Sequence, residues 1–149
     1  MNTDLTTEII LAECREWIGT PYRHQASKKQ VGCDCLGLLR GVWRRLYGCE
    51  PQKLPAYSAD WGEADSQEHL FAAAHEHMIP AQEFAIGRAI LFRWQSNLPA
   101  KHIGILMSEN TFVHAYERVG VIQSSLGNHW RPRIVGCFEF PVPAKDISA

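Results

Sequence analysis

The sequence predicts a single α+β domain in which helices come first and an antiparallel sheet follows. Two observations predict this class. Apolar residues recur at helical spacing before Pro80, and after Pro80 they gather in short β-type runs. Helices that precede the strands, instead of alternating with them, are typical of α+β domains. With 149 residues, 46% of them hydrophobic and 21% charged, the chain 1–149 suits one compact domain.

Three helices are expected in the first half of the chain. Apolar residues that recur near a 3.6-residue period place them over residues 5–18, 35–47 and 66–78. Gly19 and Gly48 follow the first two, and glycine is typical of helix ends.

The segments between these helices are expected to be irregular. Residues 20–32 contain Pro, Gly and polar residues without periodicity, so we expect a loop that leads directly to Cys35. Residues 51–65 form a Pro-containing connection in which we expect Tyr57 and Trp61 to be exposed.

Five strands are expected after Pro80. Their apolar runs cover residues 89–94, 102–107, 111–115, 120–123 and 133–140. Because no helical pattern separates them, we expect these strands to pair antiparallel.

Charge and hydropathy argue against two kinds of partner. The net charge of −1 and the pI near 6.6 give no electrostatic basis for binding nucleic acid. No window approaches the roughly 20 apolar residues of a membrane span. The N-terminal run MNTDLTTEIILAECREW has acidic residues where a signal peptide needs a basic start. We therefore expect a soluble protein made in the cytoplasm without an export signal.

Cys35 is the strongest candidate for a nucleophile, since it opens the second predicted helix. A helix N-terminus offers partial positive charge and free N–H groups, which stabilise a thiolate and can hold an oxyanion during acyl transfer. A cysteine at such a position can equally be a small buried residue without chemistry. The histidines decide between these two interpretations.

Two histidines can supply the base that a cysteine nucleophile needs and the group that fixes the tautomer of that base. His102 opens one predicted strand and His114 lies near the end of the next. If residues 108–110 form a three-residue hairpin loop, His102 faces Tyr116 and His114 is its diagonal neighbour on the same sheet face. We then expect the two imidazoles to meet, with His102 toward the thiol. A loop changed by one residue without a bulge would place the histidines on opposite faces.

Three blocks of the sequence resemble the NlpC/P60 cysteine peptidases. The run TPYRHQASKKQVGCDCLGLLRGVWRRLYG resembles the segment that carries the family's nucleophile, in an Asp-Cys-Ser-Gly type motif after a Gly-Thr-Pro-Tyr loop. HIGILM and the following FVHA resemble the family's His-Val-Gly-Ile strand and its next strand, which bears the third catalytic group. The resemblance extends from about Trp17 to Phe140, in the order Cys, His, His.

The resemblance implies a papain-like fold and an activity. The implied activity is hydrolysis of peptidoglycan stem peptides, commonly between D-γ-glutamyl and diaminopimelate or lysine, through a thioacyl-enzyme. Cys35 is then the nucleophile, His102 the general base and acid, and His114 the group that orients His102.

The same resemblance implies three residues that contact the substrate. Tyr22 lies near the implied oxyanion region, and Asp34 occupies the acidic position that can meet a substrate amine. Leu36 stands where the family usually has serine, which removes a hydroxyl from the pocket and bears on the usual stem-peptide preference.

The form of the motifs indicates a branch of the family. CDCLGL and the connection LPAYSADW look most like the phage-associated branch, which includes tail-linked peptidases of phages and gene transfer agents. This implies tail proteins as partners, and delivery by a virion or a lysis system to the periplasmic cell wall.

Other functions fit some of the same residues. N-acetylmuramoyl-L-alanine amidase activity and acyl transfer to a lipid or amine would use the same thiol, and a virion structural protein could keep the fold without turnover. Cys33 and Cys35 are not spaced as a redox Cys-x-x-Cys, and the second pair of a structural zinc site is missing. Five cysteines are an odd number, which argues against a disulfide framework. We expect no metal and no organic cofactor.

Overall fold

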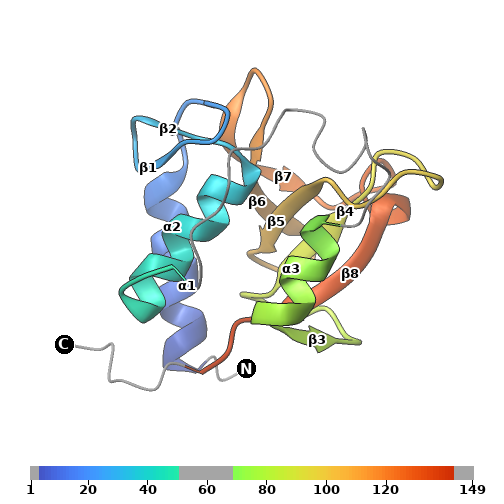
Figure 1. The fold of residues 1–149 in the computed structure, drawn as a ribbon, viewed down its shortest axis with the longest axis horizontal. Coiled ribbons are helices and arrows are strands. Elements are labelled where there is room, and N and C mark those ends of the chain that lie inside the picture. The colour runs from blue at the N-terminus through green and yellow to red at the C-terminus, as the bar shows by residue number, and fades with distance from the viewer. Residues whose placement is uncertain (1–3, 51–68, 143–149) are drawn as a thin grey trace.

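The computed structural model describes residues 4–50 and 69–142. Its elements are α1 (Leu5–Trp17), β1 (Ser27–Lys28), β2 (Gly32–Cys33), α2 (Cys35–Tyr47), α3 (His69–His77), β3 (Ile79–Ala81), β4 (Ala89–Phe92), β5 (His102–Leu106), β6 (Thr111–Tyr116), β7 (Gly120–Ser125), a 3-10 turn (Arg131–Arg133) and β8 (Ile134–Glu139). The predicted α+β class is confirmed (Figure 1). Tyr57, Trp61 and the predicted first residues of the third helix lie outside the described residues.

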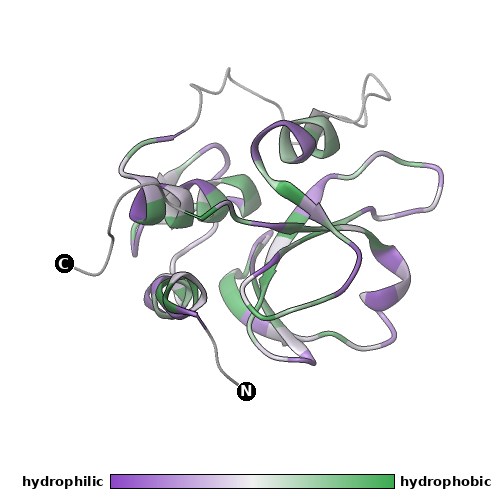
Figure 2. Ribbon diagram, turned by 90° about the horizontal axis from the view of Figure 1, so that it is seen from below, coloured by the Kyte–Doolittle hydropathy of each residue, from purple (hydrophilic) through white to green (hydrophobic). Residues whose placement is uncertain are grey.

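The helices α1 and α2 lie side by side and cover one side of the sheet (Figures 1 and 2). Their close approach depends on Gly41, since a Cβ there would lie 2.1 Å from the Trp17 ring. Trp17 is almost fully buried, and its indole N–H donates to the Glu13 carboxylate at 2.9 Å. This contact secures the end of α1, from which the chain turns into the segment that precedes Cys35.

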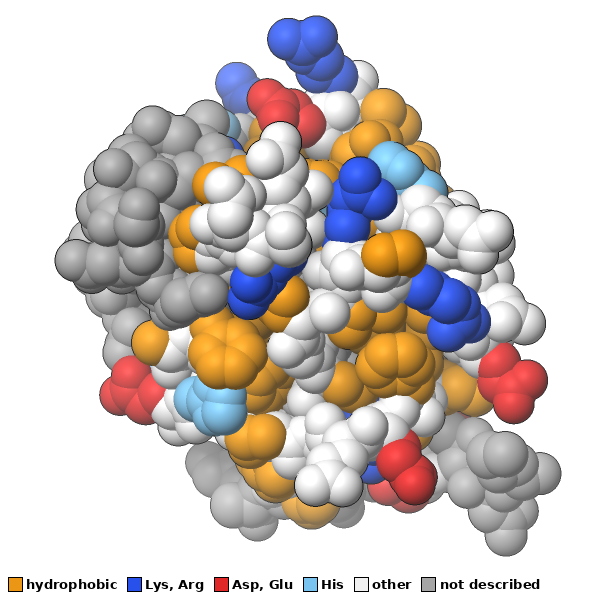
Figure 3. Space-filling view, turned by 90° about the vertical axis from the view of Figure 1, so that its right-hand side faces the viewer, with side chains coloured by type: hydrophobic (Ala, Val, Ile, Leu, Met, Phe, Trp, Pro, Cys, Tyr) orange, Lys and Arg blue, Asp and Glu red, His pale blue; other side chains and the backbone are white. Residues whose placement is uncertain are grey.

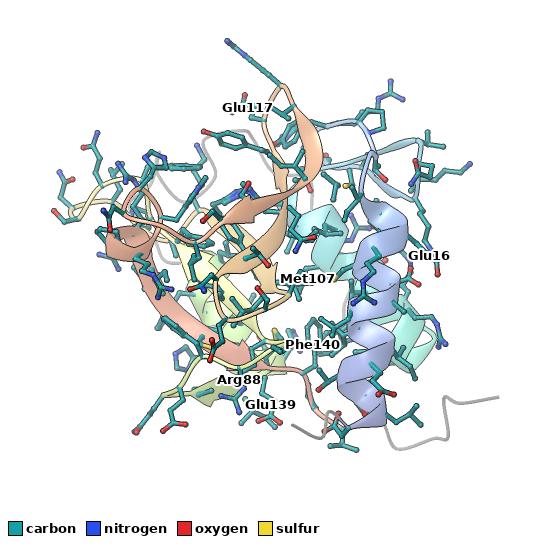
Figure 4. The ribbon with its side chains drawn as sticks, turned by 180° about the vertical axis from the view of Figure 1, so that it is seen from behind. Glu16, Arg88, Met107, Glu117, Glu139 and Phe140 are labelled. Carbon is teal, nitrogen blue, oxygen red and sulfur yellow. The ribbon has the colours of Figure 1, made fainter. Side chains whose placement is uncertain are left out.

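The larger sheet has six strands in the order β3-β8-β4-β5-β6-β7, and all its pairs are antiparallel. Side chains of a strand alternate between the two faces, so this sheet has two apolar layers. The layer toward the helices includes Ile103, Ile105, Val113 and Ala115. Met107 and Phe140 lie in the same layer, between the sheet and α1 (Figure 4).

The second layer covers the opposite face of the sheet. It is formed by Ile90, Phe92, Leu106, Phe112, Leu126 and Trp130. The alternation along β5 and β6 therefore directs His102 and His114 away from the helices, toward this aromatic layer. Because His102 is the first residue of β5, it lies at the end of the sheet.

Two predictions about local structure were incomplete. Residues 20–32 were expected to be a loop, but they contain β1, which pairs antiparallel with β2 at the end of this segment, with Ser27 opposite Cys33. β3 was not predicted, because it has three residues and contains Pro80, which cannot donate to a ladder and is tolerated at a sheet edge.

On the face at the right of Figure 1, basic side chains are scattered among apolar, acidic and polar ones (Figure 3). Among the helices formed by residues 4–50 and 69–142, none is long and apolar enough to cross a membrane.

Candidate active site

Cys35 is the first residue of α2, as the sequence predicted. The residue before it, Asp34, caps the helix: its Oδ1 accepts a hydrogen bond from the backbone N–H of Gly37 at 2.7 Å. The half-buried Cys35 thiol lies against the start of β5, where it donates to the carbonyl oxygen of Lys101 with an Sγ–O distance of 3.8 Å. The cap and the strand together fix the position of the sulfur.

Asp34 also ties the preceding segment to the helix. Its Oδ2 accepts a hydrogen bond from the backbone N–H of Gln25 at 2.7 Å, and the residue is only 2% exposed. Asp is a preferred N-cap residue, so the sequence also indicates this capping role, besides the predicted contact with a substrate amine. The contact between Asp34 and a substrate amine stays a prediction. The Asp34 side chain lines the cavity described below.

The two histidines meet as the hairpin argument predicted. Ile105 pairs with Val113 and Leu106 with Phe112, which is the register that places His102 opposite Tyr116. His102 Nε2 lies 2.8 Å from His114 Nδ1. Since Nε2 of His102 contacts His114, Nδ1 is the ring nitrogen that remains available to accept a proton from the thiol.

Aromatic rings surround His102. The ring centroid of Trp94 lies 5.2 Å away and that of Trp130 5.7 Å away, with Phe92 and Tyr116 slightly farther out. His102 is 5% exposed and His114, behind it, is fully buried at 0%. The rings limit the rotation of the imidazole and keep most water from it.

A cavity of about 460 Å³ brings most of the predicted site residues together. Its lining includes Tyr22, Asp34, Cys35, Leu36 and His102. His114 is not part of the lining and touches the site through His102. Another wall comes from Glu117 and Arg118 in the turn between β6 and β7; Glu117 is labelled at its tip in Figure 4.

The NlpC/P60 family model matches residues 19–139, which contain every element described above from β1 to β8. The chain belongs to the NlpC/P60 family. It is 29% identical over 133 residues to the murein DD-endopeptidase MepS/murein LD-carboxypeptidase of Escherichia coli K12, covering 89% of this chain and 61% of that protein. It is 28% identical over 120 residues to the probable endopeptidase NlpC of the same strain, covering 80% of this chain and 68% of that protein.

Solved structures of NlpC/P60 proteins have the same fold. The NlpC/p60 domain of the peptidoglycan hydrolase SagA aligns with a TM-score of 0.58 at 20% identity, over 90% of this chain and 98% of that domain. NlpC2 from Trichomonas vaginalis aligns with a TM-score of 0.65 at 16% identity, over 94% of this chain and 49% of that one. The predicted fold of the family is therefore confirmed.

The electrostatics of this NlpC/P60 site favour neutral side chains at rest. Burial, and after it the charge of Asp34, raises the pKa of the Cys35 thiol to about 12, although backbone N–H groups of Ile103, Leu36 and Cys35 act in the opposite direction. Burial, and after it His114, lowers the pKa of His102 to about 3. Burial likewise lowers the pKa of His114 to about 4. The sequence predicted a thiolate stabilised by the helix N-terminus; that stabilisation is present, but burial outweighs it.

We expect no thiolate in the resting protein at neutral pH. The ultraviolet difference spectrum between the wild-type protein and Cys35→Ala should lack a thiolate band at pH 7. The band should appear only in strongly alkaline solution, because the thiol pKa is raised and not lowered. A band that is present at pH 7 and disappears on acidification would show a thiolate–imidazolium pair and contradict the expectation.

Sequence reasoning missed one polar neighbour of the histidines. Ser124 Oγ lies 2.8 Å from His114 Nε2, so His114 is held on both sides. The fourth strand was predicted to end at residue 123, one position before this serine, but β7 continues to Ser125.

Within the part of the chain that the structure describes, no group of three or more His, Cys, Asp or Glu side chains could hold a metal ion.

Proposed function

We propose that this chain is a cysteine endopeptidase that hydrolyses stem peptides of bacterial peptidoglycan. The observation that carries the proposal is that Cys35 and His102 line one cavity while His114 lies 2.8 Å behind His102. A nucleophile, a base and a group that orients the base form the arrangement required for acyl transfer by a thiol. Relatives named as murein and peptidoglycan endopeptidases support the choice of substrate.

In the proposed reaction His102 acts first as a base and then as an acid. The Sγ–H proton of Cys35 moves to His102 Nδ1 as the sulfur attacks the scissile carbonyl carbon and forms the C–S bond. His102 then gives this proton to the leaving amine as the C–N bond breaks. Water activated by His102 releases the acyl group and restores the thiol.

The N-terminus of α2 stabilises the charge that develops in this reaction. The backbone N–H groups of Cys35 and Leu36 point toward the sulfur, where they lower the thiol pKa against the effect of burial. The same positive end of the helix can hold the oxyanion of the tetrahedral intermediate. Tyr22 lines the same cavity as Cys35, which supports its proposed contact with the substrate near the oxyanion.

The bond that we propose is the one between D-γ-glutamyl and diaminopimelate, or lysine at that position. Support comes from the family motifs around Cys35 and His102, and from a cavity that has both acidic and basic groups for a peptide with carboxylates and an amine. Leu36 is 9% exposed and packs into the core as well as lining the cavity, so it offers an apolar wall where the family usually has a hydroxyl.

Digestion of Gram-negative muropeptides, with products identified by mass spectrometry, tests this function. We expect new fragments that end at γ-glutamate with the wild-type protein and none with Cys35→Ala. A cut between muramic acid and alanine would instead establish an amidase, and a cut at a D,D or L,D bond would correct the proposed bond. Absence of any Cys35-dependent product from several wall types would contradict the whole proposal.

We also propose that a phage or gene-transfer-agent tail delivers the protein to the periplasmic wall. The form of the nucleophile motif, CDCLGL from Cys33 to Leu38, supports this route. Purified particles from the producing cells should then contain the chain, as peptide mass spectrometry can measure, and particles without it would contradict the route.

A further inference from the structure

The histidine pair continues into a third hydrogen-bonded group on β7. Ser124 Oγ lies 2.8 Å from Nε2 of His114, whose ring is fully buried. Ser124 pairs with Phe112 in the ladder and His114 pairs with Ile122, so the serine is a diagonal neighbour on the histidine's own sheet face. The contact is therefore built into the register of β6 and β7.

The direction of each hydrogen bond in this chain follows from the reaction. His102 can take the thiol proton only if its Nδ1 carries no proton, so its proton must be on Nε2. Nε2–H then donates to His114 Nδ1, 2.8 Å away, which must be an acceptor. The proton of neutral His114 is consequently on Nε2, and the atom that faces this N–H is Ser124 Oγ.

We propose that Ser124 is a positioning residue that sets the tautomers of both histidines. Its hydroxyl oxygen accepts the Nε2–H of His114, which keeps Nδ1 of His114 free to accept from His102, and this leaves Nδ1 of His102 free for the thiol proton. Ser124 is not among the residues that line the cavity, and its hydroxyl contacts His114. The kinetic part of the inference rests on the proposed peptidase function, whereas the tautomers are a property of the free protein.

Loss of the Ser124 hydroxyl would favour the histidine tautomers that prevent proton transfer from Cys35. The buried Nε2–H of His114 would have no acceptor, and an unpaired buried donor is unfavourable. The ring can avoid this by carrying its proton on Nδ1, which then donates to His102 Nε2. That reversal puts the His102 proton on Nδ1, where it blocks transfer from Cys35.

A pair of isosteric variants separates the hydroxyl from the shape of the side chain. Ser124→Thr keeps the hydroxyl and Ser124→Val replaces it by a methyl group in a side chain of the same shape, and both residues are favoured in strands. Ser125→Ala is the matched control, because Ser125 is the next residue of β7, exposed and directed to the other face.

Nitrogen NMR of the free protein and steady-state kinetics are the two measurements. Long-range proton–nitrogen correlations should place the proton on Nε2 of both His102 and His114 in the wild-type protein, in Ser124→Thr and in Ser125→Ala. In Ser124→Val they should place it on Nδ1 of His114, wholly or in part. For Ser124→Val we expect kcat on muropeptides to fall about tenfold or more with KM nearly unchanged, and Ser124→Thr should recover most of this loss.

Three results would overturn the inference. The first is a wild-type His114 with its proton on Nδ1. The second is a Ser124→Val protein with wild-type tautomers, and the third is an equal loss of kcat in Ser124→Thr and Ser124→Val. If the predicted tautomers are found but the wild-type protein cuts no wall peptide, the proposed function fails while the role of Ser124 in setting the tautomers stands.

Discussion

Replacing His102 by Gln is expected to lower kcat by about a thousandfold or more, because the variant loses the proposed general base and acid. The thiol cannot compensate at neutral pH. With its pKa raised to about 12, only about one Cys35 in 10⁵ is a thiolate at pH 7. The residual rate of the variant should therefore rise about tenfold for each pH unit, because the thiolate fraction does so below the pKa.

The choice of variant and control makes this result specific. Gln is close to His in size, so its side chain still fills the space among the aromatic rings around position 102. Thermal unfolding should confirm that the variant is folded. His129→Ala is the matched control, because His129 is exposed and does not line the cavity. A His102→Gln protein that keeps more than a tenth of the wild-type kcat would exclude His102 as the base.

The histidine pair shows what the sequence could predict about the site. The predicted pairing used two facts, the three residues between Met107 and Thr111 and the alternation of side chains along the strands. Both are local, and the structure has the predicted register, with Met107 N–H donating to the carbonyl of Thr111 at 2.9 Å. The position of Cys35 at a helix N-terminus was likewise predictable, since the apolar period of α2 begins directly after it.

Properties that depend on burial were not predictable in the same way. The raised pKa of Cys35 results from burial of the thiol by residues that are distant in the sequence. The local sequence around Cys35 does not indicate this burial. Ser124 was missed because the apolar alternation of its strand ends before it, while the ladder with β6 continues. The pairing of β1 with β2 depends on two residues in each strand, too few to produce a periodicity.

Gly37→Ala is expected to destabilise the protein by about 3 kcal/mol or more, which for a chain of this size lowers Tm by on the order of 10 °C. A Cβ at position 37 would lie 1.9 Å from the carbonyl oxygen of Ala26 and 3.1 Å from Asp34 Oδ1. The nearer atom belongs to the backbone, so no side-chain rotation can relieve the overlap.

The segment before Cys35 cannot move away from Gly37 without losing its own contacts. Ser27 Oγ–H donates to the carbonyl of Gly37 at 2.6 Å, and Asp34 N–H donates to the carbonyl of Ala26 at 3.3 Å. A shift of this backbone would also pull Gln25 from the Asp34 carboxylate, the group that caps α2. The glycine two residues after Cys35 is thus explained by close packing, and its loss should lower both stability and kcat.

Urea unfolding measures the free energy of unfolding of Gly37→Ala, with Gly127→Ala as the matched control. A Cβ on Gly127 would meet no heavy atom within 4 Å, and Gly127 has no positive φ, so Gly127→Ala should stay within about 0.5 kcal/mol of the wild-type protein. If Gly37→Ala were as stable as Gly127→Ala, the contact between the 25–27 segment and the first turn of α2 would be looser than described. The sulfur of Cys35, which begins that turn, would then lack the fixed position on which the proposed proton transfer to His102 depends.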